Sequence, residues 1–469
     1  MRKTWTAMLS CVLLFCLFLT ACGGNNNGGD NTASGNDAAN KPANNQAADS
    51  GSENTGGNEA TSDVAGANDE AFTIRVGAWF IDQRTFMKEF VANVEKKYKE
   101  LYPNATIQWD ILLDAKYFDK LKAELASNTA PDVFFQQGLT STFAEGNYLV
   151  DLSDQEWASK LHPGSVKFSK YDGNVYSAPM GVGTSGVWYN KKIFSDLGLE
   201  APKTWDEFMQ ACEKIKAAGI TPIALGFKDM WTAQVFAGLM IQSAGFESSK
   251  SFGKDLYDGA KKLDGPEMQG VMTKFQTMVE SGYFNKSALS LDWPQSAEMF
   301  TTGKAAMIVQ GPWMPGVAED NFKTKGHAAF DLGYFPLMTD AGYHNLAVSV
   351  DQNLSINKST KLLQQAKDLV SVILSPEIYG PYNVGNGNIP AISGIEVNYP
   401  NPVFNEVKTA LAEGESSGGF EGYIATSAYT ALAEEVTKIV SGAKFNPDDL
   451  KEAQSKQDKD KSTIILPSE

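Results

Sequence analysis

Short apolar runs alternate with amphipathic stretches from residue 72 onwards, and this alternation predicts the fold. The run at 72–80 (FTIRVGAWF) is rich in β-branched and aromatic side chains, as in a buried strand. The stretch at 84–101 places Phe86, Phe90 and Val94 at near-helical spacing among charged residues. A strand at 105–113, a helix at 117–126 and a strand at 132–136 continue the alternation. This order predicts an α/β layered domain with a largely parallel sheet.

A second set of elements is expected after residue 170. Asp172-Gly173 is a turn signal, and the apolar, glycine-rich run at 178–189 predicts a strand. Thr204 can cap a helix, and Glu207 lies three residues later as in a capping box, so a helix should run from there to Gly219. Further elements are expected as strands at 222–226 and 347–356, a helix end, turn and strand within 300–310, and a helix at 360–374. No internal repeat is visible, which favours a two-lobed α/β body over a solenoid or propeller.

Polar and aromatic side chains follow two of the predicted strands. Trp79 and Asp82 come after the first strand, and Gln136 and Gln137 come at the end of the third. Ligands of parallel sheets bind outside the carboxyl ends of the strands. We therefore expect these four side chains on the binding edge.

The N-terminus has the pattern of a targeting segment. Arg2 and Lys3 precede a short apolar core, and Leu19-Thr20-Ala21-Cys22 resembles a bacterial lipobox, in which the cysteine is acylated and the peptide is cut before it. Residues 1–21 are thus predicted to be a lipoprotein signal peptide and Cys22 the lipidation site. The alternatives are an ordinary signal peptide cleaved near Ala21 and an uncleaved anchor.

The segment at 22–70 is predicted to be a disordered tether. It contains eleven Asn, nine Gly, nine Ala and no aromatic residue. Such a composition cannot bury enough apolar surface to offset its ordering entropy. An anchor with a tether predicts a protein at the outer face of the cell membrane, attached through lipid only. Cys212 is then the one thiol of the body, which we interpret as a small buried residue.

Charge and histidine content exclude several classes of function. The chain has 56 acidic against 40 basic side chains and a net charge of -16, so nucleic acid is not an expected partner. The three histidines, His162, His327 and His344, have no ligand spacing, and we expect neither a metal nor a cofactor. No Gly-x-Ser-x-Gly elbow, His-Glu-x-x-His motif or phosphate loop is present, so no catalytic residue is predicted.

Five motifs in order together resemble one family, the extracellular solute-binding proteins of ABC sugar importers, which includes maltose-binding protein. The motifs are Ala130-Pro131-Asp132-Val133-Phe134, Tyr176-Ser177-Ala178-Pro179, Trp188-Tyr189-Asn190-Lys191-Lys192-Ile193-Phe194, Pro202-Lys203-Thr204-Trp205-Asp206-Glu207-Phe208 and the run at 303–313 (GKAAMIVQGPW).

The resemblance implies a type II periplasmic-binding-protein-like fold, in which two α/β lobes joined by hinge strands close on a ligand. Lobe 1 is expected at 71–180 and 351–395, and lobe 2 at 181–350 and 396–469. The crossings should lie near 179–183 and 348–351, with a return near Ala391. The implied partners are a carbohydrate and the transmembrane subunits of an ABC permease, and the protein is expected to be a monomer.

Sugars present apolar faces and hydroxyl rims, so their sites combine aromatic platforms with planar polar side chains. The resemblance places Trp313 on a family stacking tryptophan, Tyr189 on a cleft-facing position and, by looser spacing, Tyr429 on another stacking aromatic. Trp231 and Trp293 lie between predicted elements and complete the aromatic candidates. Trp109, Trp157, Trp188 and Trp205 are interpreted as structural.

The remaining polar candidates are Asp292, Asp351 and Gln352, at predicted strand ends or crossings. Asp351 lies beside a hinge strand, where a carboxylate can bind ligand on closure, although a solvated turn aspartate is the alternative. The Asp-Arg pair of maltose-binding protein is absent, and Gln136-Gln137-Gly138 occupies its region, which indicates a different sugar. A binding protein for a polyamine or peptide, and a secreted glycoside hydrolase with paired carboxylates, stay open as alternatives.

The lipobox interpretation has a direct test. Replacement Cys22→Ala removes the sulfur that would carry the lipid, so the protein should appear in the medium instead of the membrane fraction after cell fractionation. Continued membrane retention of the variant would refute the lipobox.

Overall fold

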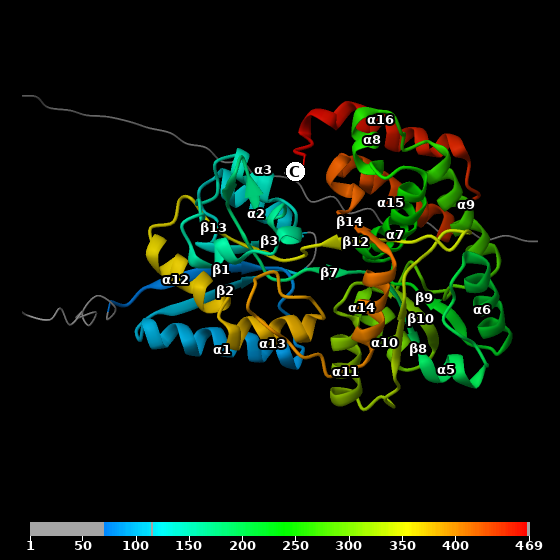
Figure 1. The fold of residues 1–469 in the computed structure, drawn as a ribbon, viewed down its shortest axis with the longest axis horizontal. Helices are drawn as coiled ribbons and strands as arrows, with labels where there is room; N and C mark the ends of the chain where they lie inside the picture. The colour runs from blue at the N-terminus through cyan, green and yellow to red at the C-terminus, as the bar shows by residue number, and fades with distance from the viewer. Residues whose placement is uncertain (1–69, 114–115, 467–469) are drawn as a thin grey trace, which may run out of the picture. The chain divides into compact units, whose positions relative to one another are not determined.

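The computed structural model of the protein describes residues 70–113 and 116–466 (Figure 1). All of them belong to one unit of the chain, Asp63–Glu469. The predicted signal peptide, the tether up to residue 69 and Cys22 lie outside the described residues. None of the helices within the described residues is long and apolar enough to cross a membrane.

Lobe 1 is built on a five-stranded sheet of order β2-β1-β3-β13-β6. Its β1 pairs in parallel with β2 and β3, with Val76 opposite both Trp109 and Val133. Its β13 pairs antiparallel to β3 and β6. The predicted parallel strands are therefore present, and a later part of the chain adds the antiparallel side. The strands are β1 Thr73–Ala78, β2 Thr106–Ile111, β3 Val133–Gln136, β6 Ala178–Pro179 and β13 Asn353–Ile356.

Helices cover this sheet and bury its apolar residues. On α1 the positions Phe90, Val94 and Tyr98 are buried at helical spacing, and they join Val76 and Leu354 of the sheet in one core. The larger helices are α1 Thr85–Leu101, α2 Lys116–Ala126, α12 Leu363–Ile373 and α13 Pro376–Asn386. The shorter elements are α3 Thr140–Glu145, η1 Glu156–Lys160, α4 Pro163–Val166, β4 Lys170–Tyr171 and β5 Asn174–Val175.

Lobe 2 is built on a four-stranded sheet of order β11-β8-β10-β9. Its central strands β8 and β10 run antiparallel, with Trp188 opposite Ile308. All six residues of β10 are buried, as expected for a central strand covered on both faces. The strands are β8 Gly186–Asn190, β9 Thr221–Ala224, β10 Ala305–Gln310 and β11 Leu332–Phe335.

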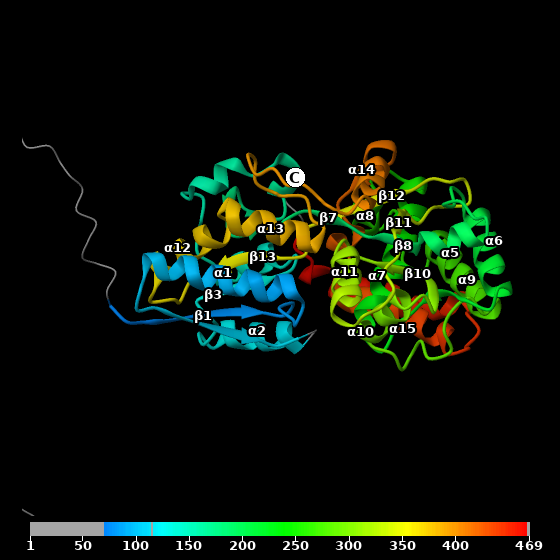
Figure 2. The same ribbon diagram turned by 90° about the horizontal axis from the view of Figure 1, so that it is seen from below.

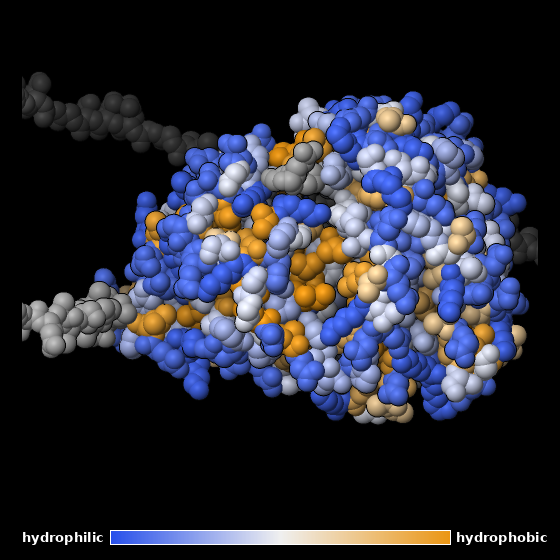
Figure 3. Space-filling view, in the orientation of Figure 1, coloured by the Kyte–Doolittle hydropathy of each residue, from blue (hydrophilic) through white to orange (hydrophobic). Residues whose placement is uncertain are grey.

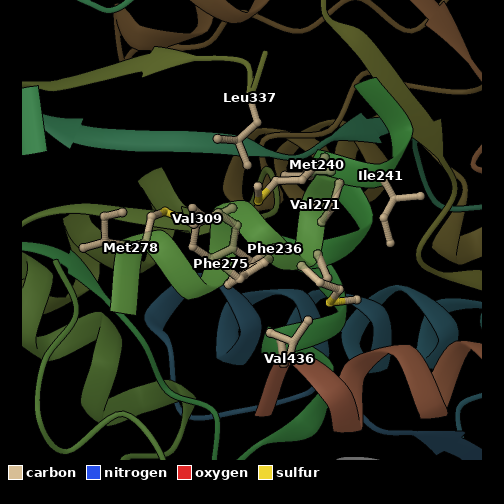
Figure 4. Packing of buried hydrophobic residues seen from close by; sticks show 14 of the residues in the cluster. Phe236, Met240, Ile241, Val271, Phe275, Met278, Val309, Leu337 and Val436 are labelled. Carbon is tan, nitrogen blue, oxygen red and sulfur yellow. The ribbon is translucent and has the colours of Figure 1, made fainter. Parts of the chain in front are cut away.

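The core of lobe 2 surrounds helix α7, Met230–Ser248. Phe236 and Met240 of α7 lie among Phe275, Val309 and side chains of other elements in the close view of Figure 4. Because α7 is buried on most of its circumference, it lacks the polar stripe by which an amphipathic helix is recognised in a sequence. The other elements are α5 Lys191–Asp196, α6 Trp205–Ala217, α8 Phe252–Asp258, α9 Pro266–Glu280, α10 Trp293–Thr301, α11 Met314–Thr324, α14 Val403–Glu413, η2 Phe420–Tyr423, α15 Thr426–Val440, η3 Pro447–Leu450, α16 Lys451–Asp460 and η4 Lys461–Thr463.

The start of α6 matches the predicted capping. Thr204 accepts a hydrogen bond from the Glu207 amide, 3.3 Å away, while the Glu207 carboxylate accepts from the Lys203 amide at 2.7 Å. Thr204 is therefore the cap, and Glu207 binds one residue further back than in a standard capping box. The helix ends at Ala217, and Gly219 has a φ of +79°. Cys212 is fully buried on this helix, as expected.

A third sheet, of order β14-β12-β7, joins the lobes and is called the hinge sheet below. Its strands are β7 Gly183–Thr184, β12 Asn345–Ser349 and β14 Glu415–Ser417. The strand β7 follows β6 of lobe 1 after three residues, and β12 likewise precedes β13 of lobe 1. In both Figure 1 and Figure 2, β7 lies between the elements of lobe 1 and those of lobe 2.

Two sequence predictions are wrong at the hinge sheet. The single strand expected at 178–189 is three short strands, and the one expected at 347–356 is two strands in different sheets. The physical reason is the same in both places, because the chain passes from one lobe to the other and must change its hydrogen-bonding partner. The sequence analysis predicts no element directly after Pro312, where the structure has helix α11.

Gly387 at the end of α13 should be intolerant of a side chain. Its φ is +65°, and a β-carbon would collide with the Pro312 carbonyl oxygen and the Phe404 ring. We expect Gly387→Ala to lower the free energy of unfolding by roughly 2–3 kcal/mol, measured by urea denaturation.

Gly394→Ala is the matched control for this prediction. Gly394 has a φ of +84°, but a β-carbon there would have no atom within 4 Å. Gly394→Ala should therefore lower the free energy of unfolding by the backbone strain alone, about 1 kcal/mol. Equal losses in the two variants would contradict a role for the close contact.

Candidate ligand-binding site

Three tryptophans of lobe 2 form one cluster, which we call the tryptophan cluster: Trp231, Trp293 and Trp313. The Trp231 ring lies 5.7 Å from that of Trp293 and 6.0 Å from that of Trp313, with interplanar angles of 65° in both pairs. Each indole is half-buried, so each keeps some solvent-accessible surface. The sequence analysis named all three separately, and the fold brings them together.

Each of these rings lies at the beginning of a helix. Trp231 and Trp293 stand in the first turns of α7 and α10, and Trp313 directly precedes α11. The Trp293 amide donates to the Asp229 carboxylate at 2.8 Å, which ties the start of α10 to the start of α7. A β-carbon on Gly311 would collide with the Trp313 ring, so glycine is what lets this indole fold back over the chain.

Asp292 supports this cluster by capping α10. Its carboxylate accepts from the Gln295 amide at 3.0 Å, and the Gln295 side chain bonds back to the Asp292 amide in a capping box. Lys228 lies 3.8 Å from the same carboxylate. These contacts use the Asp292 carboxylate to hold the start of α10 and with it Trp293. The structure therefore gives Asp292 a capping role, whereas the sequence analysis predicted that it binds ligand.

Trp79 belongs to a second aromatic group, in lobe 1. It follows β1 and packs on Phe80 and Phe118, with ring centroids 5.2 and 4.9 Å away. It is half-buried and lies at the carboxyl edge of the sheet, where it was expected. Asp82, three residues on, forms an ion pair with Arg84, with Oδ2 2.7 Å from Nε.

The two glutamines after β3 differ in what they contact. Gln136 is fully buried, donates to Thr140 Oγ1 at 2.6 Å and accepts from the Leu139 amide at 2.8 Å. It therefore fixes the turn into α3 and has no surface for a ligand. Gln137 is exposed, and its Nε2 donates to Asp351 Oδ1 at 3.0 Å.

Asp351 lies at the crossing between β12 and β13 and is bound by two amides. Gln137 donates to one carboxylate oxygen and Gln352 to the other. Burial raises the Asp351 pKa to about 6, and the two amide hydrogen bonds oppose that shift. The side chain nevertheless keeps partial solvent contact, so a ligand can reach it. Gln352 is itself buried, where it orients the carboxylate.

Tyr429 of α15 lies one helical turn along α7 from the tryptophan cluster. Its hydroxyl donates to the Gln234 carbonyl at 3.0 Å and lies 2.7 Å from where a β-carbon on Gly238 would be. Glu421, which the sequence analysis did not single out, is its neighbour, and burial raises the pKa of both groups. Trp231, Gln234 and Gly238 share one face of α7, so this face leads from the tryptophans to Tyr429.

Tyr189 lies apart from these groups. It is 8 % exposed and its ring packs on Phe194 and Phe335 at 4.3 and 5.7 Å. Burial raises the Tyr189 pKa to about 12. The Tyr189 side chain packs in the core of lobe 2 beside Gly333. We therefore do not include Tyr189 in the candidate site.

Two polar residues of the site gave no sequence signal. Arg84 is largely buried next to Asp82 and carries a guanidinium nitrogen, Nη1, with no hydrogen-bond partner. Glu421 follows the short strand β14, whose pairing with β12 joins segments 70 residues apart. No local sequence pattern predicts such a long-range strand pairing, although Gly418-Gly419 indicates a turn before Glu421.

Polar residues cover much of the surface in Figure 3, and apolar residues gather toward the middle of the face shown. Within the described part of the chain, no group of three or more His, Cys, Asp or Glu side chains is placed to hold a metal ion. The chemistry that the site offers is thus aromatic contact together with hydrogen bonding by carboxylates, amides and a phenol.

A direct contact joins the two lobes at the start of α1. Helix α1 has no side-chain cap of its own, and its first residue, Thr85, donates through both amide and hydroxyl to Asp320 of α11, at 3.0 and 2.9 Å. Nearby, a β-carbon on Gly316 of α11 would collide with the Gly385 carbonyl of α13. The missing cap of a lobe 1 helix is therefore supplied by lobe 2.

Comparisons with known proteins fit this geometry. Residues 81–379 match the sequence model of the bacterial extracellular solute-binding protein family. The multiple sugar-binding protein of Streptococcus mutans is 23% identical over 71% of this chain and 79% of its own length. The diacetylchitobiose-binding protein DasA of Streptomyces coelicolor is 29% identical over 60% of this chain and 64% of its own.

Solved structures share the fold. A chitin oligosaccharide-binding protein superposes with a TM-score of 0.74 at 24% identity, over 84% of this chain and 99% of that one. RafE in complex with raffinose gives a TM-score of 0.71 at 20% identity, over 83% and 100%. The two-lobed architecture expected from the sequence is confirmed.

The contact between the lobes predicts the effect of Asp320→Ala. Loss of a helix cap costs about 1 kcal/mol, so the equilibrium between closed and open lobes should move about fivefold toward the open state. Small-angle X-ray scattering of the variant should give a larger radius of gyration than that of the natural protein.

Glu319→Ala is the control, because Glu319 of the same helix accepts from Asn401 at 3.1 Å and does not contact lobe 1 in this way. An unchanged radius of gyration for Asp320→Ala, or an equal change for both variants, would contradict the capping contact.

Proposed function

Because this chain belongs to the bacterial extracellular solute-binding protein family, we propose that it is the solute-binding component of an ABC importer and captures an oligosaccharide between its two lobes. The single observation that carries the sugar assignment is the tryptophan cluster. Three half-exposed indoles held at helix starts provide rigid apolar surface with few rotors to freeze, which suits the C–H faces of sugar rings.

Hydroxyl recognition is assigned to the carboxylate and amides at the crossing. Asp351 is held by Gln137 from lobe 1 and by Gln352 beside it, so its lone pairs have a fixed direction. A sugar hydroxyl can donate to such a carboxylate and accept from an amide in the same plane. The proposed ligand-binding set is Trp79, Gln137, Trp231, Trp293, Trp313, Asp351 and Tyr429.

Capture by closure is supported by the connections between the lobes. The segments between β6 and β7 and between β12 and β13 are three residues each, so small changes in their backbone angles can rotate one lobe against the other. The Thr85–Asp320 contact and the approach of Gly316 to Gly385 are the closed-state contacts in this scheme. A ligand that touches both lobes shifts the equilibrium toward closure.

We assign the protein a role in binding and delivery without chemistry on the ligand. Glycoside hydrolysis requires two carboxyl groups facing one glycosidic bond at a fixed separation. Here Asp292 caps a helix, and Asp82 pairs with Arg84. The relatives named for their sugars, the multiple sugar-binding protein and DasA, are binding proteins, which supports the same role for this chain.

The location proposed for the protein is the outer face of the cell membrane. Cys22, acylated after removal of residues 1–21, would hold the body there, and residues 22–70 would give it slack to reach the permease. Two acyl chains are enough for stable anchoring, whereas one is marginal. The body is proposed to act as a monomer that presents its loaded, closed form to the transmembrane subunits.

The sugar assignment is tested by isothermal titration with a panel of oligosaccharides and by analysis of the products. Trp313→Ala should weaken binding of the preferred sugar by roughly 30-fold or more, since a buried aromatic anchor is worth about 2 kcal/mol. Trp109→Ala, on the edge strand β2, is the matched control and should leave affinity unchanged. Release of shorter sugars, or binding that survives Trp313→Ala, would contradict the proposal.

A further inference from the structure

An open cavity of about 300 Å³ lies in lobe 2, between α7, α9 and the loop that follows β11. Its apolar lining includes Met240 of α7, Val271 of α9 and Met338 of the loop, and each of these residues is less than one-tenth exposed. Met240 and Val271 are labelled close together in Figure 4. The volume is at the small end of the range found for small-molecule pockets, roughly 300–1,000 Å³. The cavity therefore has room for a short hydrocarbon body.

The cavity lies on the side of α7 away from the tryptophan cluster. Its lining residues on this helix are Met240, Ala244 and Glu247, at positions i, i+4 and i+7. With about 3.6 residues per turn, these positions share a face roughly opposite to the one that carries Trp231 and Gly238. A ligand in the cavity and a sugar at the tryptophan cluster thus use different surfaces of the same helix.

Glu267, at the start of α9, contributes an unused acceptor to the cavity wall. Its side chain is 8 % exposed, and its Oε2 is buried without a hydrogen-bond partner. Lys261 donates to the other oxygen, Oε1, at 2.6 Å. Ser248 also approaches this carboxylate, but its hydroxyl proton is donated to the Gly245 carbonyl at 2.8 Å. Burial opposes ionisation of Glu267, yet the hydrogen bond from Lys261 helps to bring its pKa below the ordinary value, so the group is a carboxylate.

The charges around the cavity leave one acid without a cationic partner. The lining holds three acidic side chains and one lysine. The lysine, Lys274, pairs with Asp340 at 2.8 Å, and the buried acid of α9 has its own lysine. Glu247 accepts a hydrogen bond from the neutral Thr339 hydroxyl at 2.9 Å, and within residues 70–113 and 116–466 it takes part in no ion pair. The cavity therefore attracts a cation and repels an anion.

We propose that this cavity is a second binding site, for a small organic cation that carries an ammonium group on an apolar body. The ammonium group donates to Glu267 Oε2 and is attracted by the charge of Glu247, and the body packs on Met240, Val271 and Met338. Methionine side chains suit such a site because they adapt to ligands of different shape. The site is separate from the proposed sugar site and does not depend on the sugar assignment.

Three probes with the same hydrocarbon chain test the proposal: hexylammonium, hexanol and hexanoate. The protein, labelled with ¹³C at its methionine methyl groups, is titrated with each probe by NMR, and Met240→Leu and Met338→Leu assign the two signals. Hexylammonium should shift both signals, with a dissociation constant in the millimolar range expected for a ligand of about seven non-hydrogen atoms. It should bind roughly tenfold more tightly than hexanol, because both partners of its hydrogen bond are charged. Hexanoate should cause no shift.

Two variants connect the response to the cavity. Gly270 of α9 lines the cavity, and a β-carbon there would have no atom within 4 Å, so the side chain of Gly270→Leu can enter the space without a clash. Because leucine also favours a helix more than glycine does, this variant should fold and should no longer respond to hexylammonium. Glu267→Gln should weaken hexylammonium binding roughly fivefold and leave hexanol binding unchanged. Glu280→Gln, at the exposed end of the same helix, is the control and should keep the full response.

The outcomes separate this inference from the proposed function. Absence of any shift at Met240 and Met338, equal binding of hexylammonium and hexanol, or a response that survives in Gly270→Leu overturns the second site. None of these results bears on the sugar site, which has its own test in Trp313→Ala. Failure of sugar binding would likewise leave the response to hexylammonium as expected.

Discussion

The chain crossings between the lobes determine where each functional side chain can lie. The crossing at 180–182 and the one at 350–352 both pass the hinge sheet, whose three strands come from distant parts of the chain, from Gly183–Thr184 to Glu415–Ser417. Two glycines near the crossings allow the chain to approach Pro312 closely. Gly183 lies against the Pro312 ring, and Gly387 lies against the Pro312 carbonyl oxygen. Pro312 in turn precedes Trp313, so the joint between the lobes and the tryptophan cluster share one short segment.

The aromatic side chains and the hydrogen-bonding carboxylate of the proposed site consequently belong to different parts of the fold. The chain crossings connect these parts. The indoles belong to lobe 2 and are fixed by helix starts and by Gly311. The carboxylate of Asp351 belongs to a crossing and is oriented by an amide from lobe 1. In the proposed scheme, a sugar ring against the tryptophans meets Asp351 with its polar rim when the lobes close. This coupling is how ligand binding would shift the hinge equilibrium.

Local patterns predicted the parts of the fold that depend on local periodicity. The strand and helix order of lobe 1 and the cap at Thr204 were found because alternation and capping are readable over a few residues. No bounds were predicted for helix α7, since burial removes its polar stripe. The strands at 178–189 and 347–356 were merged because a change of sheet leaves no trace in hydropathy. Trp231 and Trp293 were identified by their positions between predicted elements, and Trp313 through the family resemblance. Glu421 was not identified, because its place depends on the long-range pairing of β14 with β12. Tyr189 and Gln136 show the opposite case, in which a residue type suited to binding is used for packing or for a turn.

A crystal structure of the protein with a bound oligosaccharide tests the central claim most directly. The account predicts sugar rings against the indoles of Trp231, Trp293 and Trp313, a hydroxyl within hydrogen-bond distance of Asp351, and the Thr85–Asp320 contact in place. A ligand bound elsewhere on the body, with the tryptophan cluster unoccupied, would contradict it.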